Sequence, residues 1–186
     1  MAKSILAGLF IGLGAIVNLS AGNRLVGAFM FSLGLLLVII FKADLFTGKI
    51  GYFIDEPTGK NALKLLKILI GNVVGVFIMA MLVRLSMPEI YGKLCLMDFL
   101  PSDLSYLVLA IPCGALMYLA VEGYKRSNSL FIPMLCVATF IVCGFQHCIV
   151  VAFYSVFFGA FNFKLILAVI GNTLGAIALR ALTKES

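Results

Sequence analysis

Long apolar segments separated by short polar stretches run along almost the whole chain. A helix that crosses a bilayer needs about 20 mostly apolar residues. Six segments approach that length: Ile5–Leu19, Leu25–Phe41, Leu63–Leu85, Leu104–Val121, Ser129–Phe158 and Leu165–Leu182. The pattern predicts an all-α polytopic membrane protein with six spans, in which residues 1–186 form a single transmembrane domain.

Two of the six segments are expected to be broken. The second is followed by KADLFTGK at residues 42–49, which is polar and contains a glycine. The fifth is too long for one crossing and contains Gly144 just before a Gln-His pair. Non-helical backbone at membrane depth is tolerated where protein covers it or where it lines a cavity. We therefore expect two half-helices joined by a short loop in each, with breaks near Asp44–Lys49 and Gly144–Cys148.

The chain matches itself when it is shifted by 100 residues. GNVVG at 71–75 falls on GNTLG at 171–175, and Thr47 falls on His147. Further matches are Gly14 with Gly114, Ala15 with Ala115, Leu19 with Leu119, Phe31 with Phe131, Leu35 with Leu135 and Phe53 with Phe153. The matches predict duplication of a three-span unit, with repeat 1 at 1–97 and repeat 2 at 98–186. Because three is odd, the second copy enters the membrane from the opposite side, and such inverted repeats place their site near the midplane.

The composition supports a membrane protein without a soluble domain. Only 12% of the residues are charged and 63% are hydrophobic, whereas a soluble domain needs far more charge to cover its surface. The first segment is expected to be a span and not a signal peptide, because glycines at 8, 12 and 14 suit helix packing. The five cysteines form no Cys-x-x-Cys or Cys/His ligand set, so we expect neither a disulfide framework nor a metal site.

The distribution of basic residues predicts the orientation. Cytoplasmic loops of membrane proteins carry an excess of Lys and Arg. With six spans and the N-terminus inside, eight basic residues lie inside and four outside. Those inside are Lys3, Lys60, Lys64, Lys67, Lys125, Arg126, Arg180 and Lys184, and those outside are Arg24, Arg84, Lys93 and Lys164. We expect a multi-pass protein of the cell (inner or plasma) membrane with both termini cytoplasmic. Topology explains the net charge of +6 without a nucleic-acid partner.

The only histidine, His147, lies inside the apolar sequence GFQHCIVV. An ionisable residue within a membrane span is a functional candidate by default. The alternative is a buried histidine that caps a helix or packs. The start of a half-helix favours an anion, and two inverted breaks would direct two such ends at one point. Thr47 and Asn172 would each offer a hydrogen bond to the solute or to His147. Their alternatives are helix capping for Thr47 and helix packing for Asn172.

Two lysines bracket the first break. Lys42 and Lys49 would concentrate anions by electrostatic steering if they face a vestibule. The alternative is a lysine that extends its charged end to the membrane surface, or a Lys42–Asp44 pair without a role in transport.

At these residues the sequence resembles the formate/nitrite transporter family of pentameric anion channels. ADLFTG at 43–48 and FSLGL at 31–35 resemble its second helix, GFQH at 144–147 resembles its fifth-helix motif Gly-Phe-Glu-His, and the Gly-Asn pair at 171–172 resembles its sixth helix. The resemblance covers nearly the whole chain in order. It implies an aquaporin-like fold with one pore per protomer, and a homopentamer.

The resemblance also implies roles for individual residues. It matches His147 to the family's central histidine, Thr47 to its break threonine and Asn172 to its sixth-helix asparagine. The implied constriction residues are Leu45 and Phe46 beside one constriction, Phe31 and Phe140 closing the pore on that same side, and Leu35 on the other side. Gln146 stands where the family has a glutamate.

The function implied is a membrane channel or transporter for small monovalent anions of the formate, nitrite or hydrosulfide class. The alternative is a pore for small neutral solutes, such as protonated weak acids or water, on the same scaffold. A membrane-embedded enzyme would need clustered carboxylates, His or Cys at one depth, and the single histidine argues against it. There is no Gly-x-x-x-x-Gly-Lys phosphate loop and no ligand set for a redox cofactor. We therefore expect no enzyme activity and no cofactor, and as partners only the anion, the lipid bilayer and further copies of the chain.

Overall fold

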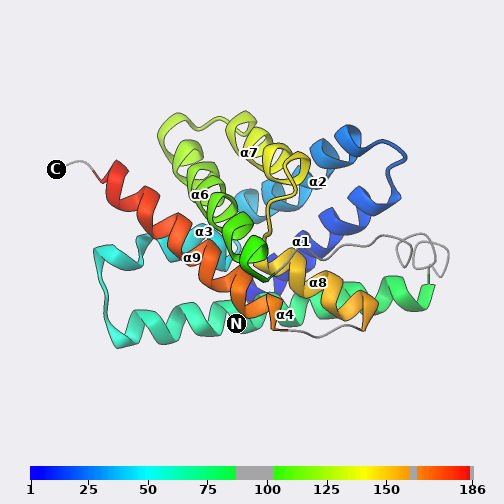
Figure 1. Cartoon of the computed structure of the whole chain (residues 1–186), viewed down its shortest axis with the longest axis horizontal. Helices are drawn as coiled ribbons and strands as arrows, with labels where there is room; N and C mark the ends of the chain where they lie inside the picture. The colour runs from blue at the N-terminus through cyan, green and yellow to red at the C-terminus, as the bar shows by residue number, and fades with distance from the viewer. Residues whose placement is uncertain (87–102, 160–162, 185–186) are drawn as a thin grey trace.

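The computed structural model describes residues 1–86, 103–159 and 163–184, and the regular structure in these ranges is helical (Figure 1). In chain order the elements are α1 (Ala2–Ser20), α2 (Arg24–Ile40), α3 (Phe46–Lys49), the 3-10 helix η1 (Ile50–Asp55), α4 (Gly59–Ser86), α6 (Asp103–Ser127), α7 (Phe131–Val142), α8 (Cys148–Phe158) and α9 (Lys164–Thr183). The expected boundary between the two repeats, at residues 97 and 98, lies outside the described residues.

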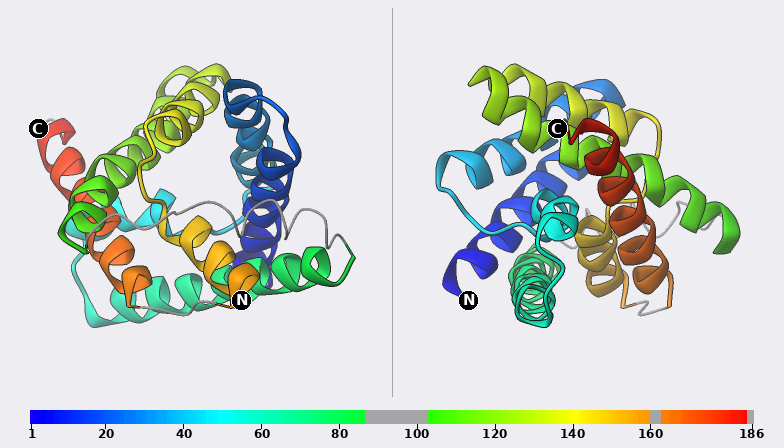
Figure 2. Two further views of the ribbon diagram at one scale, coloured as in Figure 1. Left: turned by 45° about the vertical axis from the view of Figure 1, so that its right-hand side comes forward. Right: turned by 90° about the vertical axis from the view of Figure 1, so that its left-hand side faces the viewer.

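Among the residues that the structure describes, four helices are long and apolar enough to cross a membrane, namely α1, α4, α6 and α9. They correspond to the first, third, fourth and sixth predicted spans. The helices α2, α7 and α8 are apolar but shorter. They belong to the second and fifth predicted spans, which the structure divides into α2 followed by α3 and η1, and α7 followed by α8 (Figure 2).

The helices pack as two matching sets. In the first set α1 packs against α2 and α4, and in the second α6 packs against α7 and α9. The sets interlock, because α4 packs against α8 of the other set and α9 packs against η1. The broken helices α2 and α7 pack against each other. Figure 1 shows α4 along one edge of the molecule and α7 on the opposite side.

Close glycine contacts join the first and third helices of each set. A Cβ on Gly8 of α1 would overlap the carbonyl oxygen of Asn72 in α4. A Cβ on Gly114 of α6 would overlap the carbonyl oxygen of Asn172 in α9. Small residues at such positions let helix backbones approach within a membrane. The packing of α1 agrees with the expectation that this segment is a span.

These contacts correct the ungapped shift of 100 residues. Asn72 and Asn172 occupy the same place in α4 and α9, so the shift holds for the third helices. In the first helices, however, Gly114 corresponds to Gly8, which is 106 residues earlier, and not to Gly14. Gly14 instead lies against the Phe31 carbonyl on α2. The offset differs because α6 has 25 residues and α1 has 19.

Candidate functional site

The first break lies between α2 and α3. Lys42 has a positive φ of 50°, and the amide of Ala43 donates to the Val38 carbonyl at 2.9 Å. A left-handed residue with this hydrogen bond is a Schellman turn, which ends a helix and satisfies its last carbonyl groups. The chain then extends to Leu45, which is the N-cap residue of α3.

The second break, between α7 and α8, has the same backbone structure. Gly144 has a positive φ of 71°, and the amide of Phe145 donates to the Phe140 carbonyl at 2.9 Å. The chain extends to His147, which is the N-cap residue of α8. Glycine adopts a left-handed conformation at little cost, whereas a residue with a Cβ, such as the lysine in the first break, is strained there.

The two breaks therefore correspond at a spacing of 102 residues. His147 therefore corresponds to Leu45, because both are N-cap residues. The shift of 100 residues, which paired His147 with Thr47, is two residues too small at the breaks. The non-helical residues are 41–45 and 143–147. The predicted first break, Asp44–Lys49, extended too far because Thr47 and its neighbours already belong to α3. The predicted second break ended one residue late.

Asn172 of α9 fastens the second break. Its Oδ1 accepts a hydrogen bond from the Cys148 amide at 2.8 Å, at the first residue of α8. Its Nδ2 donates to the carbonyls of Ala110 and Gln146, both at 2.8 Å. Both N–H bonds of this fully buried amide are therefore used by the backbone. No donor of Asn172 is left for a solute or for His147 in this arrangement.

Asn72 of α4 fastens the first break in the same way. Its Oδ1 accepts from the Phe46 amide at 2.8 Å, and its Nδ2 donates to the carbonyls of Ser4 at 2.7 Å and Asp44 at 2.8 Å. Buried polar groups are expensive unless they are hydrogen-bonded, and here one side chain satisfies three backbone groups. The two asparagines thus perform one structural task in the two sets, whereas the sequence had suggested a solute-binding role for Asn172.

Thr47 and His147 meet between the two breaks. Thr47 Oγ1 lies 2.9 Å from His147 Nε2, and both side chains are buried, with exposed fractions of 0% and 2%. His147 Nδ1 accepts from the Val150 amide at 3.4 Å, which makes the imidazole the cap of α8. If Nδ1 accepts, a neutral imidazole carries its proton on Nε2 and donates it to Thr47. The hydroxyl proton of Thr47 then remains available for another acceptor.

Apolar side chains surround this polar pair. The Phe140 ring stacks on the His147 imidazole with centroids 5.6 Å apart, and it meets the Phe31 ring edge to face at 5.8 Å. The other predicted constriction residues, Leu35, Leu45 and Phe46, are also buried. All five belong to the hydrophobic core of the protein.

The two bracketing lysines differ in their surroundings. Lys49 forms an ion pair with Asp44, so its charge is largely neutralised. Lys42 is exposed and has no ion-pair partner among the residues that the structure describes. The Lys42–Asp44 pair considered from the sequence is not the one that forms. Sequence reasoning missed the Lys49–Asp44 pair, because it spans the start of a helix whose position was predicted wrongly.

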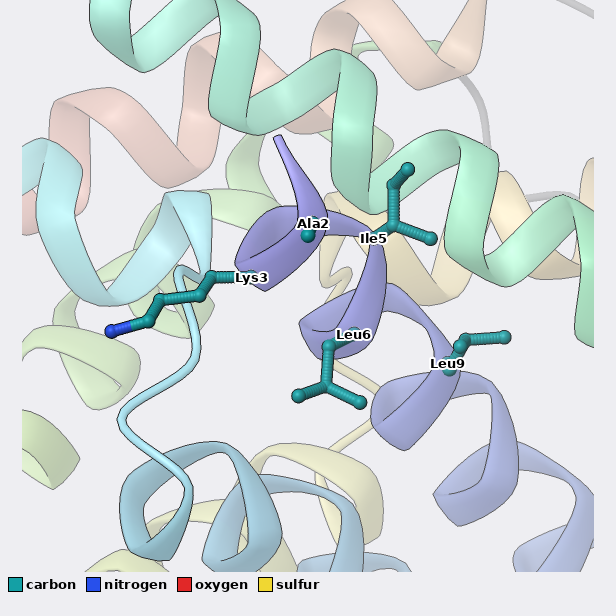
Figure 3. Close-up of a pocket in the computed structure, with 5 residues that line it drawn as sticks. All are labelled: Ala2, Lys3, Ile5, Leu6 and Leu9. Carbon is teal, nitrogen blue, oxygen red and sulfur yellow. The ribbon is translucent and has the colours of Figure 1, made fainter.

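A surface groove of about 440 Å³ runs along the N-terminal part of α1 (Figure 3). Its lining residues are Ala2, Lys3, Ile5, Leu6 and Leu9. None of them belongs to the candidate site, and the Thr47–His147 pair is closed off by protein. Within the described ranges no group of three His, Cys, Asp or Glu side chains is placed to hold a metal ion.

Two interrupted helices that meet at a buried polar pair, among helices apolar enough to cross a membrane, define a multi-pass α-helical membrane protein. The family model described as "Formate/nitrite transporter" matches residues 1–184. The chain therefore belongs to the formate/nitrite transporter family, as the motifs of its second, fifth and sixth spans indicated.

Curated relatives agree with this assignment. The chain is 28% identical over 174 residues to "Formate channel FocA" of Escherichia coli (strain K12), a match that covers 78% of this chain and 61% of the relative. The protein of the same name from Escherichia coli O157:H7 matches with the same identity and the same coverage. The chain thus spans about six tenths of the length of these relatives. They are described as channels and not as enzymes.

Solved structures of the same fold cover almost the whole chain. An "FNT family ion channel" has a TM-score of 0.83 and 23% identity, over 97% of this chain and 86% of that chain. A "Pentameric formate channel with formate bound" has a TM-score of 0.75 and 23% identity, over 97% of this chain and 92% of that chain. At this identity the likeness establishes the fold.

Proposed function

We propose that this protein is a membrane channel for small monovalent anions of the formate, nitrite or hydrosulfide class, with a pore centred on His147. The observation that carries the proposal is the buried hydrogen bond between Thr47 and His147 at the meeting point of two matching helix breaks. Family membership supports the same class of solute, and FocA is described as a formate channel.

The geometry provides what a dehydrated anion needs. An anion that leaves bulk water must meet fixed hydrogen-bond donors, because a buried unpaired charge is very costly. The Thr47 hydroxyl proton is such a donor, and the N–H on Nε2 of His147 becomes one when the solute takes the place of Thr47 as its acceptor. The α8 helix begins directly after His147 with the positive end of its dipole. The imidazole donates while neutral and takes up a proton when an anion lies beside it. Phe31, Phe140 and Leu35 supply the apolar wall at which water is removed.

Asn172 acts in this proposal as a positioning residue. Its amide holds the Cys148 amide and the Gln146 carbonyl on either side of His147. This fixes the backbone that carries the imidazole, while Thr47 and His147 make the contacts with the solute. Lys42 steers anions towards the first break, and Lys49 contributes less because Asp44 neutralises it.

We further propose that the chain forms six spans in two inverted three-span repeats of aquaporin-like topology, with both termini cytoplasmic in the cell (inner or plasma) membrane. Support comes from the two matching helix sets and from the reciprocal contacts of α4 with α8 and of α9 with η1. Both breaks have the same turn, and in both an asparagine side chain binds the first amide of the following half-helix, an arrangement called the asparagine clamp below. Duplication of one unit predicts this similarity.

A homopentamer is the proposed assembly. One structural neighbour is described as a pentameric formate channel. The outer faces of α2, α4 and α9 expose large apolar side chains, which need either lipid or another subunit as cover. The expected partners are therefore the anion, the lipid bilayer and further copies of this chain.

The second candidate is a pore for small neutral solutes, such as protonated weak acids or water. Gln146 favours it, because a neutral amide stands beside His147 and donates to the Gly144 carbonyl at 2.9 Å. Flux measured against membrane potential in proteoliposomes separates the two. A formate current that reverses at the formate equilibrium potential supports the anion channel, whereas formate uptake without any current supports the neutral pore.

A further inference from the structure

Arg24 occupies the end of the α2 face that carries two of the proposed constriction residues. Phe31 and Leu35 follow it by seven and eleven residues, which correspond to about two and three helical turns. The three side chains therefore share one face of the helix. The neighbouring Leu25 and Val26 point away from this face and are more than half exposed.

The guanidinium of Arg24 reaches across to α7. Its Nη2 donates to the Val142 carbonyl at 2.8 Å, and Val142 is the last residue of α7. A cation is favourable at the carboxyl end of a helix. This bond joins α2 and α7, the helices whose Phe31 and Phe140 rings meet. It uses one of the five N–H donors of the guanidinium, and the side chain of Arg24 makes no other hydrogen bond within the described ranges.

The second break has no charged residue of its own that could do the same. Gly144 and Gln146 stand where the first break has Lys42 and Asp44. The positive charge at the end of α7 therefore comes from Arg24, which belongs to α2.

On the basis of the proposed function, we propose that Arg24 is the anion-recruiting residue of the pore mouth beside Phe31 and Phe140. An anionic solute binds the free guanidinium donors before it loses water at the phenylalanine pair. Seven residues of α-helix place Phe31 about 10 Å from Arg24 along the axis. This is about the Debye length at 0.1 M ionic strength, so the attraction reaches the constriction and weakens at higher salt.

Single-channel recording in planar bilayers tests the proposal, with sodium formate added to one side at a time. The variants are Arg24→Gln, which removes the charge, Arg24→Lys, which keeps it, and Lys60→Gln, which removes an exposed charge from the start of α4. We expect Arg24→Gln to raise the half-saturating formate concentration about 3- to 10-fold from one side only, with the effect shrinking as inert salt is added. Arg24→Lys and Lys60→Gln should stay within twofold of the unmodified chain.

The outcomes separate this proposal from the function on which it rests. If the unmodified chain conducts formate and Arg24→Gln behaves identically from both sides, the recruiting role is wrong while the channel stands. An equal loss from both sides, or a loss that Arg24→Lys shares, would make Arg24 a structural link between α2 and α7. Absence of formate current in the unmodified, assembled chain would overturn the proposed function itself.

Discussion

Thr47 Oγ1 and His147 Nε2 lie 2.9 Å apart although 100 residues separate them in the chain. The bond joins the start of α3, in the first helix set, to the N-cap of α8, in the second. Since both side chains are buried, neither can lose its partner to water. This contact links the two breaks directly, and any solute that passes between them must compete with it.

Replacement of Thr47 by Val keeps the volume of the side chain and removes its hydroxyl. We expect anion flux to fall about tenfold or more, because a hydrogen bond to a charged group contributes about 1.5–3 kcal/mol. Stopped-flow formate flux into proteoliposomes measures this. Ser155→Ala is the matched control, since it removes a buried hydroxyl that bonds only within α8. Equal flux in the Thr47→Val and Ser155→Ala variants would count against a solute contact at Thr47.

The asparagine clamps predict equal losses of stability at two positions. Asn72→Leu and Asn172→Leu each leave the first amide of a half-helix and one carbonyl of a break without their partner, and each such group costs about 1–3 kcal/mol. The carbonyls of Ser4 and Ala110 lie within α1 and α6 and keep their helical hydrogen bonds. Thermal unfolding in detergent should show a large and similar drop in Tm for both. Asn61→Ala, at a partly exposed position near the start of α4 where the side chain donates only to the Glu56 carbonyl, should lower Tm much less. A Tm unchanged by Asn172→Leu would show that the second break is held by other contacts.

Substitutions at the two left-handed residues, Lys42 and Gly144, should change the stability of the protein in opposite directions. Lys42→Gly relieves backbone strain and should stabilise the protein by up to about 1 kcal/mol. Gly144→Ala should destabilise it by about 1–2 kcal/mol through backbone strain alone, because a Cβ at this position meets no atom within 4 Å. Chemical denaturation in detergent measures both. A loss of stability in Lys42→Gly would mean that the lysine side chain makes a stabilising contact that outweighs the strain.

Removal of the Asp44 carboxylate, which pairs with Lys49 at the first break, should increase anion flux. Asp44→Asn leaves Lys49 without its partner and adds a positive charge to the first break. Anion flux at low salt should rise about 2- to 5-fold, and the rise should disappear in high salt. The double variant Asp44→Asn, Lys49→Gln is the control and should return to the flux of the unmodified chain. Unchanged flux in Asp44→Asn would place this pair away from the path of the anion.

Much of the fold follows from the sequence because apolar segments of span length leave few alternatives. The four long helices lie where the pattern placed them, and both interruptions occur where a glycine or a polar stretch enters an apolar segment. The Thr47–His147 contact was also predicted. However, the shift of 100 residues was only part of the correct reason, since Leu45 is the structural counterpart of His147.

What the sequence could not provide are the contacts whose partners are backbone atoms. The Arg24 bond ends on the carbonyl of Val142, which any residue at that position would supply. The sequence also did not reveal that the first helices of the two sets correspond at a spacing of 106 residues and the breaks at 102. Single matches between apolar residues carry too little information to show this. The three backbone bonds of Asn172, which change its expected role, depend on helix positions that no local pattern specifies.

The central claim is that His147 supplies a titratable donor to an anion at the pore centre. Its most direct test is the ratio of formate flux in His147→Asn and His147→Phe to that of the unmodified chain, between about pH 5 and 8, the range in which histidine charge changes. The ratio cancels the protonation of formate itself. The account predicts ratios that change with pH for both variants, and a flux at least about tenfold lower in His147→Phe, which has no donor. Assembled variants whose ratios stay at one across this range would contradict the claim and leave His147 as a buried cap of α8.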